Sequence, residues 1–209
     1  MSTRPFDATD PDLLHPARTG LVVFDMLECY RPKIEASGVI ETVRSLADDC
    51  RERGVPIFFA RADHRDDGMD ANPTLTDVTP EFEPWPGGRQ RFTHTHSRAE
   101  FGVIAELSPQ PEDYDVPKHR WSAFFETHLR LSTQSRGIDT IMIVGGSTHV
   151  GVASTAFSAR DMGYQVVVIR DGVTGYEPQR SFFVDHVFPR MCRVRTAAES
   201  IAMLNRTEV

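Results

Sequence analysis

Residues able to do hydrolytic chemistry stand directly after short apolar runs of the chain. Asp25 follows the run at residues 20–24, Lys118 follows residues 114–117, and Gly145-Gly146-Ser147 closes the run that begins at residue 138. A carboxyl group can transfer a proton, an ammonium group can orient it or bind an anion, and glycines let a backbone approach a substrate closely. Because a carboxylate at the end of an apolar strand is costly unless it is used, Asp25 is the first catalytic candidate.

The elements that must position these residues alternate along the chain. Strands are expected at residues 20–24, 55–60, 114–116, 138–144, 165–169 and 192–195, and helices at 39–50, 122–136, 151–163, 178–190 and 197–205. The alternation predicts the α/β class: a three-layer α/β/α Rossmann-like domain with a mainly parallel, roughly six-stranded sheet. Ligands bind beyond the carboxyl ends of such strands, and this edge is expected to collect Asp25, Arg61, Lys118, residues 145–147 and Asp171.

The chain of 209 residues has the length of one domain, which we take to span residues 1–209. Residues 1–19 are polar and predict an arm on the surface. Residues 61–113 contain six prolines and many acids, which predicts a long loop. Because a loop of this length in a compact domain is usually functional, we expect substrate choice and subunit contacts to depend on it.

The charge balance limits the partners. Lysine and arginine number 23 against 30 aspartates and glutamates, a net charge of −7. Nucleic acids and anionic membranes both require a basic face, so neither is expected as a partner. No apolar run is long enough to cross a bilayer, and the N-terminus has no apolar signal core, which favours a cytoplasmic location. The three cysteines are far apart and predict no disulfide framework.

Four motifs, in order along the chain, carry a family resemblance. They read LVVFDM at residues 21–26, KHRWSAFF at 118–125, GGSTHVGV at 145–152 with STA at 154–156, and DMGYQVVV at 161–168 with Asp171. Over most of residues 20–205 the chain resembles the isochorismatase-like hydrolases, which include nicotinamidases, N-carbamoylsarcosine amidases and true isochorismatases. The resemblance implies Asp25 and Lys118 as catalytic residues, and a homodimer or homotetramer.

One position departs from most members of that superfamily. Where they carry a nucleophilic cysteine, this sequence has Gly151, which can neither attack a carbonyl group nor carry an acyl group. Glycine at this position resembles the isochorismatases of siderophore and phenazine pathways, whose reaction is hydrolysis of a vinyl ether. That reaction needs a proton donor, which would be Asp25. Cys29 lies just after Asp25; a packing role is favoured, and its presence in the pocket stays open.

A substrate-binding set follows from the strand ends and the resemblance. An arginine at position 61 can hold a carboxylate through two parallel hydrogen bonds. A cis peptide bond is expected at Gly146-Ser147, and the amides of Val150 and Gly151 are expected to face an anion or a carbonyl oxygen. The set comprises Arg61, Trp85, Arg120, Trp121, Phe125, Ser147, Thr148 and Val150, with the aromatic members as pocket walls. These local cations on an acidic chain predict a small substrate bearing a carboxylate.

Alternatives stay open for the metal and for the reaction. Residues 63–67 read DHRDD, and His94 and His96 would share one side of an extended segment, but the ligand spacing of the nicotinamidases is not reproduced. We therefore expect no metal and no cofactor. The chain is alternatively an amidohydrolase in which Asp25 activates water, or a binding protein that lost its nucleophile. Retention of Asp25 and Lys118 speaks against the binding protein.

Overall fold

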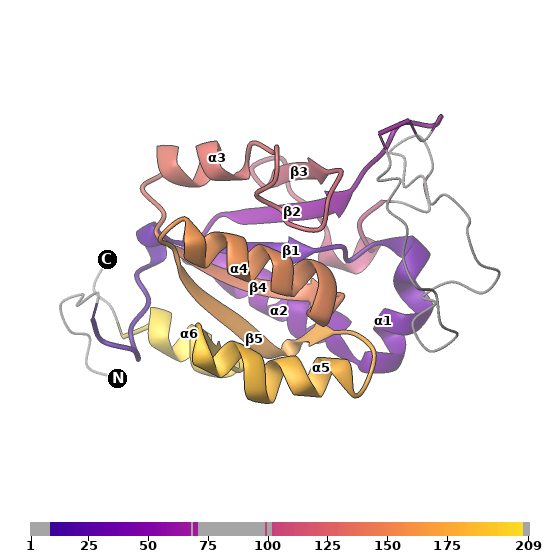
Figure 1. Cartoon of the computed structure of the whole chain (residues 1–209). Helices are drawn as coiled ribbons and strands as arrows, with labels where there is room; N and C mark the ends of the chain where they lie inside the picture. Colours follow the sequence, from indigo (N-terminus) through magenta and orange to yellow (C-terminus); the bar gives the residue numbers. More distant parts are fainter. Residues whose placement is uncertain (1–8, 68, 71–98, 100–101, 207–209) are drawn as a thin grey trace.

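One six-stranded sheet runs through the part of the chain that the computed structural model describes, residues 9–67, 69–70, 99 and 102–206. Its order is β3-β2-β1-β4-β5-β6, and every neighbouring pair is parallel (Figure 1). The strands are β1 (Thr19–Phe24), β2 (Ile57–Ala62), β3 (Tyr114–Lys118), β4 (Thr140–Gly146), β5 (Gln165–Thr174) and β6 (Arg193–Arg195). The predicted α/β class with a mainly parallel sheet is confirmed.

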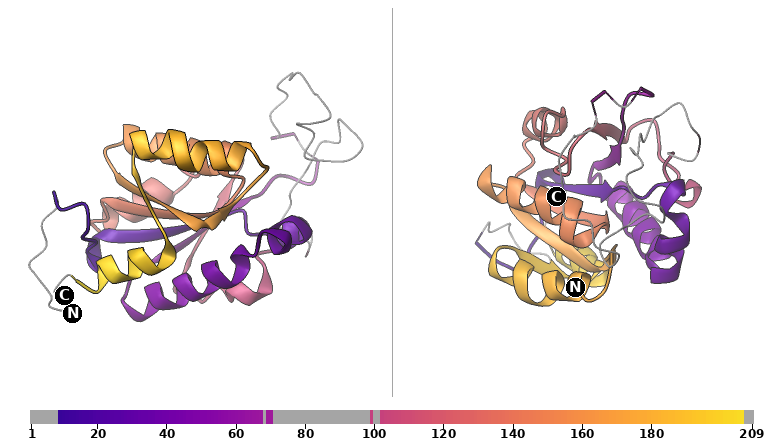
Figure 2. Two further views of the ribbon diagram at one scale, coloured as in Figure 1. Left: turned by 90° about the horizontal axis from the view of Figure 1, so that it is seen from below. Right: turned by 45° about the vertical axis from the view of Figure 1, so that its right-hand side comes forward.

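Helices cover both faces of the sheet, as the left view of Figure 2 shows. One face carries α1 (Arg31–Ser37), α2 (Val39–Glu52) and α6 (Ala197–Leu204). The other carries α3 (Leu129–Ser135), α4 (Ala153–Asp161) and α5 (Gln179–Phe182), which continues through turns to residue 190. A wide helical turn, Thr148–Val152, leads into α4, and short 3₁₀ turns occupy Pro16–Arg18, Glu28–Tyr30 and Ala105–Leu107. Among the described residues, no helix is long and apolar enough to span a membrane.

The central strands are apolar because both their faces are covered. All six residues of β1 are buried, as are the first six of β4. Side chains alternate between two core clusters, so that Val22 and Phe24 pack toward α3 and α4 while Leu21 and Val23 pack toward α2 and α6. The continuous apolar runs of the sequence are the signature of this two-sided burial.

Three sequence expectations about elements were wrong. The helix expected at 122–136 begins only at Leu129, because Glu126 has a left-handed backbone (φ 52°) and the Thr127 hydroxyl bonds to the Ala123 carbonyl. The strand expected to end at residue 169 runs to Thr174, which leaves Asp171 inside β5, where it accepts a hydrogen bond from the Ala197 amide. Leu13 and Leu14, which lie in the segment expected to form a surface arm, are buried. Most of the loop expected at 61–113 lies outside the described residues.

The carboxyl ends of β1 and β4 approach each other closely. Phe24 pairs with Gly145, which has a φ of +98°. A Cβ atom at position 145 would lie 2.0 Å from the Phe24 carbonyl oxygen. Glycine is therefore required at this position on two counts, backbone conformation and space.

We expect Gly145→Ala to lower the free energy of unfolding by at least about 3 kcal/mol, because a left-handed backbone and a backbone clash both oppose the methyl group. Gly163→Ala is the matched control: its φ is +88°, but nothing lies within 4 Å of its Cβ position. The control should lose only about 1–2 kcal/mol. Urea denaturation measures both, and equal losses would contradict the close approach.

Candidate active site

A buried ion pair joins β1 to β3 at the carboxyl edge of the sheet. The Lys118 Nζ donates to Asp25 Oδ2 at 2.7 Å, and the two side chains are 4% and 14% exposed. The Asp25 Oδ1 accepts a hydrogen bond from the Ala62 amide, also at 2.7 Å. The structure thus brings together the two residues that the sequence placed first, with every carboxylate oxygen in contact with a donor.

The backbone fixes Asp25 as firmly as its side chain. The Asp25 amide donates to the Ala60 carbonyl at 2.8 Å, and the residue has a φ of 45°. A non-glycine residue held in this left-handed region is costly and occurs mostly at functional sites. The turn at Asp25 lifts its carboxylate off the end of β1 and toward β2 and β3.

Register across the strands explains how Lys118 arrives. Ala62 pairs with Lys118 in the β2–β3 ladder, and the Asp63 amide donates to the Lys118 carbonyl. The Lys118 side chain lies on the same face as Val116, in the core cluster that contains Phe24. Its Nζ stands 4.3 Å from the centroid of the Phe24 ring, a cation–π contact.

The segment after β4 has its polar groups largely engaged within the protein. The peptide bond Gly146-Ser147 is cis, as expected from the sequence. The buried Thr148 hydroxyl donates to the Thr174 carbonyl at 2.8 Å, and the Val150 amide donates to the Ser147 carbonyl at 3.2 Å. The Val150 amide is thus engaged within the wide turn, and its contact with a substrate stays a prediction.

Arg61 was expected beside Lys118 and lies on the opposite face. Successive residues of a strand point to opposite sides, so Arg61 is directed away from the face shared by Ala62 and Lys118. Its guanidinium group binds Asp115 at 2.6 Å and Asp63 at 3.1 Å, and these carboxylates raise its pKa. In this arrangement Arg61 does not serve as the predicted substrate anchor.

The remaining predicted binding residues have contacts or exposures of their own, and their roles toward a substrate stay predictions. Arg120 donates to the carbonyls of Asp70 and His119. Trp121 and Phe125 are 68% and 51% exposed. Trp85 lies outside the described residues, so its predicted role stays a prediction.

Further aromatic and basic residues, outside the predicted set, interact with one another and, in the case of Tyr30, with Asp25. Burial raises the pKa of Tyr30, and the charge of Asp25 adds to the effect, which places this phenol in the field of the carboxylate. The Lys33 ammonium hydrogen-bonds the Tyr176 hydroxyl, and the His149 ring lies 6.4 Å from that of Tyr176. Burial also lowers the pKa of His149. No residue periodicity indicates that Tyr30 approaches Asp25, because the approach depends on packing.

One group of side chains could hold a metal ion among the described residues. Ligand atoms of His64, Asp70 and His119 lie within 4.8 Å of one another. Asp70 also accepts hydrogen bonds from the Arg65 amide, and burial lowers the pKa of His64. His64 belongs to the DHRDD segment considered from the sequence, whereas Asp70 and His119 were not expected as ligands. The approach of these two residues to His64 depends on where β3 ends.

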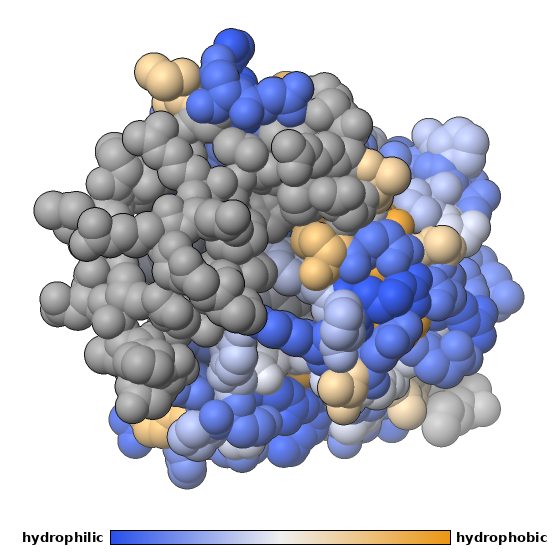
Figure 3. Space-filling model, turned by 90° about the vertical axis from the view of Figure 1, so that its right-hand side faces the viewer, coloured by the Kyte–Doolittle hydropathy of each residue, from blue (hydrophilic) through white to orange (hydrophobic). Residues whose placement is uncertain are grey.

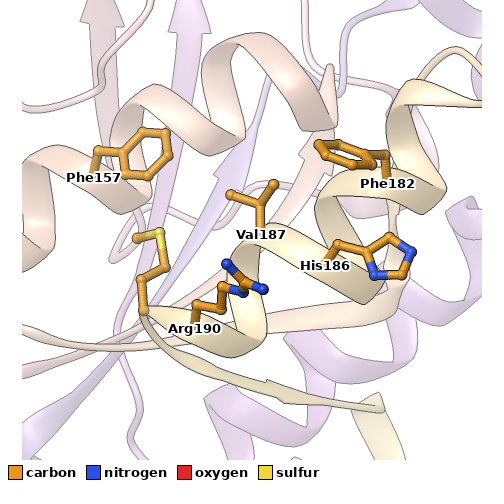
Figure 4. A pocket seen from close by; sticks show the side chains of 6 residues that line it. Phe157, Phe182, His186, Val187 and Arg190 are labelled. Atoms are coloured by element: carbon orange, nitrogen blue, oxygen red, sulfur yellow. The ribbon is translucent and has the colours of Figure 1, made fainter.

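Two regions of the surface are relevant to function: the carboxyl edge of the sheet and a hollow that lies apart from it. Figure 3 looks onto the carboxyl edge of the sheet, where the described surface is mostly hydrophilic with separate hydrophobic patches. Elsewhere, on the outer side of α4 and α5, an open hollow of about 690 Å³ is lined by Phe157, Phe182, His186, Val187, Arg190 and Met191 (Figure 4). None of the residues around Asp25 lines this hollow, so it is a separate feature.

Comparison with known proteins gives the family. An isochorismatase domain model matches residues 19–199. The chain is 34% identical over 183 residues to the isochorismatase family protein YwoC of Bacillus subtilis, covering 87% of this chain and 92% of YwoC. It is 39% identical over 179 residues to the ureidoacrylate amidohydrolase RutB of Variovorax paradoxus, covering 78% and 71%. A solved isochorismatase family protein from Burkholderia thailandensis superposes with a TM-score of 0.77 at 29% identity, covering 92% of this chain and 98% of the other. The chain belongs to the isochorismatase family of hydrolases.

Proposed function

We propose that this hydrolase cleaves a vinyl ether in a small anionic substrate, with Asp25 as the general acid and no covalent thiol intermediate. The observation that carries the proposal is the buried Asp25–Lys118 pair in a site where position 151 has no side chain. Proton transfer requires only a positioned carboxyl group, whereas covalent acyl transfer requires a nucleophile. Isochorismate, the vinyl ether that the family name denotes, is the first compound to test.

The proposed reaction proceeds by proton transfer to carbon. Protonated Asp25 gives its proton to the methylene carbon of the enol ether, and the electron pair of the double bond forms the new C–H bond. The resulting oxocarbenium ion is captured by water at the ether carbon. The captured water loses one proton, which restores protonated Asp25, to give a hemiketal. The hemiketal then collapses: its C–O bond to the alcohol breaks, its hydroxyl proton passes to the departing oxygen, and pyruvate and the alcohol are released. Lys118 holds the Asp25 carboxyl group in place before the substrate binds.

The resting contacts raise the question of how Asp25 acquires its proton. Both of its oxygens accept hydrogen bonds, from Lys118 and from the Ala62 amide, so a proton on Asp25 has to displace one of these donors. An anionic substrate brings negative charge beside the carboxylate and competes for the Lys118 ammonium, and both effects favour protonation. A substrate carboxylate is therefore part of the proposed mechanism as well as of recognition.

The same contacts favour a second candidate, an amidohydrolase. An ionised Asp25 held by two donors is suited to remove a proton from water, which would attack an amide carbonyl directly. The relative RutB from Variovorax paradoxus carries the name of an amidohydrolase. This candidate shares Asp25 and Lys118 with the first and differs in the direction of the first proton transfer.

A substrate panel separates the two candidates. Purified protein is incubated with isochorismate, with ureidoacrylate and with a neutral carboxamide, and pyruvate and ammonia are measured. We expect pyruvate release from isochorismate and little ammonia from the other two. Rapid ammonia release without turnover of isochorismate would overturn the vinyl-ether proposal in favour of the amidohydrolase.

Asp25→Asn should lower turnover on the order of 10²–10⁴-fold with the fold intact, because the amide keeps the shape but cannot donate or take up the proton. Asp171→Asn is the matched control, since Asp171 also follows an apolar run of a strand but bonds to the Ala197 amide away from the site. The control should keep its turnover. Steady-state kinetics measure the turnover, and circular dichroism checks the fold. Unchanged turnover in Asp25→Asn would exclude Asp25 from the mechanism.

We also propose that the protein acts as a homodimer or homotetramer. Phe157 and Phe182 are 44% and 56% exposed, and both line the hollow over α4 and α5. Contiguous exposed aromatic surface is typical of protein–protein contacts.

Light scattering at micromolar concentration should therefore give a mass of at least twice the 23.5 kDa of the chain. Phe182→Glu should lower that mass, because a charge in a buried contact is costly. Leu131→Glu, on α3 and 68% exposed, is the control and should leave the mass unchanged. A monomer in the wild-type protein would contradict the assembly.

A further inference from the structure

The Phe24 ring lies against both position 151 and the ammonium group of Lys118. An ideal Cβ atom on Gly151 would lie 2.1 Å from the Phe24 Cε1 and 2.3 Å from its Cζ. The face of the same ring stands 4.3 Å from the Lys118 Nζ. One aromatic side chain thus fills the space beside residue 151 and contacts the ammonium group of the ion pair.

The ring cannot move aside without cost. Phe24 is 1% exposed and packs with Val22, Phe58 and Ala60 in a continuous core cluster. Its backbone is equally enclosed, because its carbonyl oxygen lies where a Cβ on Gly145 would stand. The obstruction at position 151 begins at the Cβ atom, so no rotamer of a larger side chain avoids it.

The ring also restrains Lys118. A lysine side chain has four rotatable bonds and loses considerable freedom when it is fixed. In the structure the ammonium group is held by the Asp25 carboxylate and by the Phe24 ring face, in surroundings that leave Lys118 4% exposed. A cation–π contact gains strength where water is excluded.

We propose that Phe24 is a positioning residue with two effects: it closes the site to any side-chain nucleophile at position 151, and it seats the Lys118 ammonium against Asp25. The first effect concerns space alone and is independent of the substrate. The second rests on the proposed function. The absence of a thiol is accordingly a property of the residue pair 24 and 151, so that restoring a cysteine at 151 would not by itself restore a competent site.

The first effect is tested by introducing a cysteine at position 151, once with the Phe24 ring present and once with the ring removed. Gly151→Cys and the double variant Phe24→Val/Gly151→Cys are treated with iodoacetamide at pH 7, and labelling at residue 151 is followed by peptide mass spectrometry. The native thiols of Cys50 and Cys192 give a low background, because burial raises their pKa to about 12. Melting temperatures of both variants are measured in parallel.

The double variant should melt at a higher temperature than Gly151→Cys, and its Cys at 151 should be labelled at least about tenfold faster. Failure of the single variant alone to fold would agree with the proposal. The proposal is overturned if the single variant melts like the wild-type protein and is labelled as fast as the double variant. Neither readout requires a substrate, so the proposed reaction can fail while this result stands.

The second effect is tested with Phe24→Leu against Phe58→Leu. Both remove a buried aromatic ring from the same core cluster, but the Phe58 ring stacks on Tyr114. A purely structural role predicts similar losses of melting temperature and of turnover in both variants. We expect Phe24→Leu to lower kcat about tenfold more than Phe58→Leu, with little difference in KM, because Lys118 loses its aromatic contact. Equal kcat values in the two variants would overturn the positioning role of Phe24. If neither cysteine variant folds, this comparison still tests that positioning role.

Discussion

The contact between Lys118 and Asp25 is the interaction on which the rest of the site depends. It requires three neighbouring strands to end at matched heights, because β1 supplies Asp25, β2 supplies the Ala62 amide and β3 supplies Lys118. A buried ion pair is stable only when its remaining hydrogen-bonding positions are filled. Here the backbone of β2 fills the second carboxylate oxygen, so the sheet register and the ion pair stabilise each other.

Most of the positive charge near this edge is already engaged. Arg61 is bound by two carboxylates on the far face, and Arg120 donates to backbone carbonyls. Lys118 supplies positive charge directly to Asp25, whereas the Lys33 ammonium group hydrogen-bonds the Tyr176 hydroxyl. Under the proposed function, an anionic substrate competes for Lys118, so that this one residue takes part both in binding and in positioning Asp25.

The parts of this arrangement that follow from local pattern could be predicted from the sequence. Apolar runs predicted the strands, and the rule that ligands bind at carboxyl ends placed Asp25 and Lys118 at one edge. Arg61 was misplaced because strand alternation was not applied to it; its neighbour Ala62, not Arg61, shares the face of Lys118. The late start of α3 depends on Glu126 adopting a left-handed backbone, and the approach of Tyr30 to Asp25 depends on packing, so neither is written in residue periodicity.

The same residue, Phe24, limits the space at both Gly145 and Gly151. Phe24 ends β1, and the next residue, Asp25, carries the carboxylate of the buried ion pair. The Phe24 carbonyl excludes a side chain at 145, and its ring excludes one at 151. Glycine at 151 would on its own suggest a site that lost its nucleophile and kept a void. Because an aromatic ring fills that space and contacts Lys118, position 151 leaves no void, and the same ring packs against the ion pair.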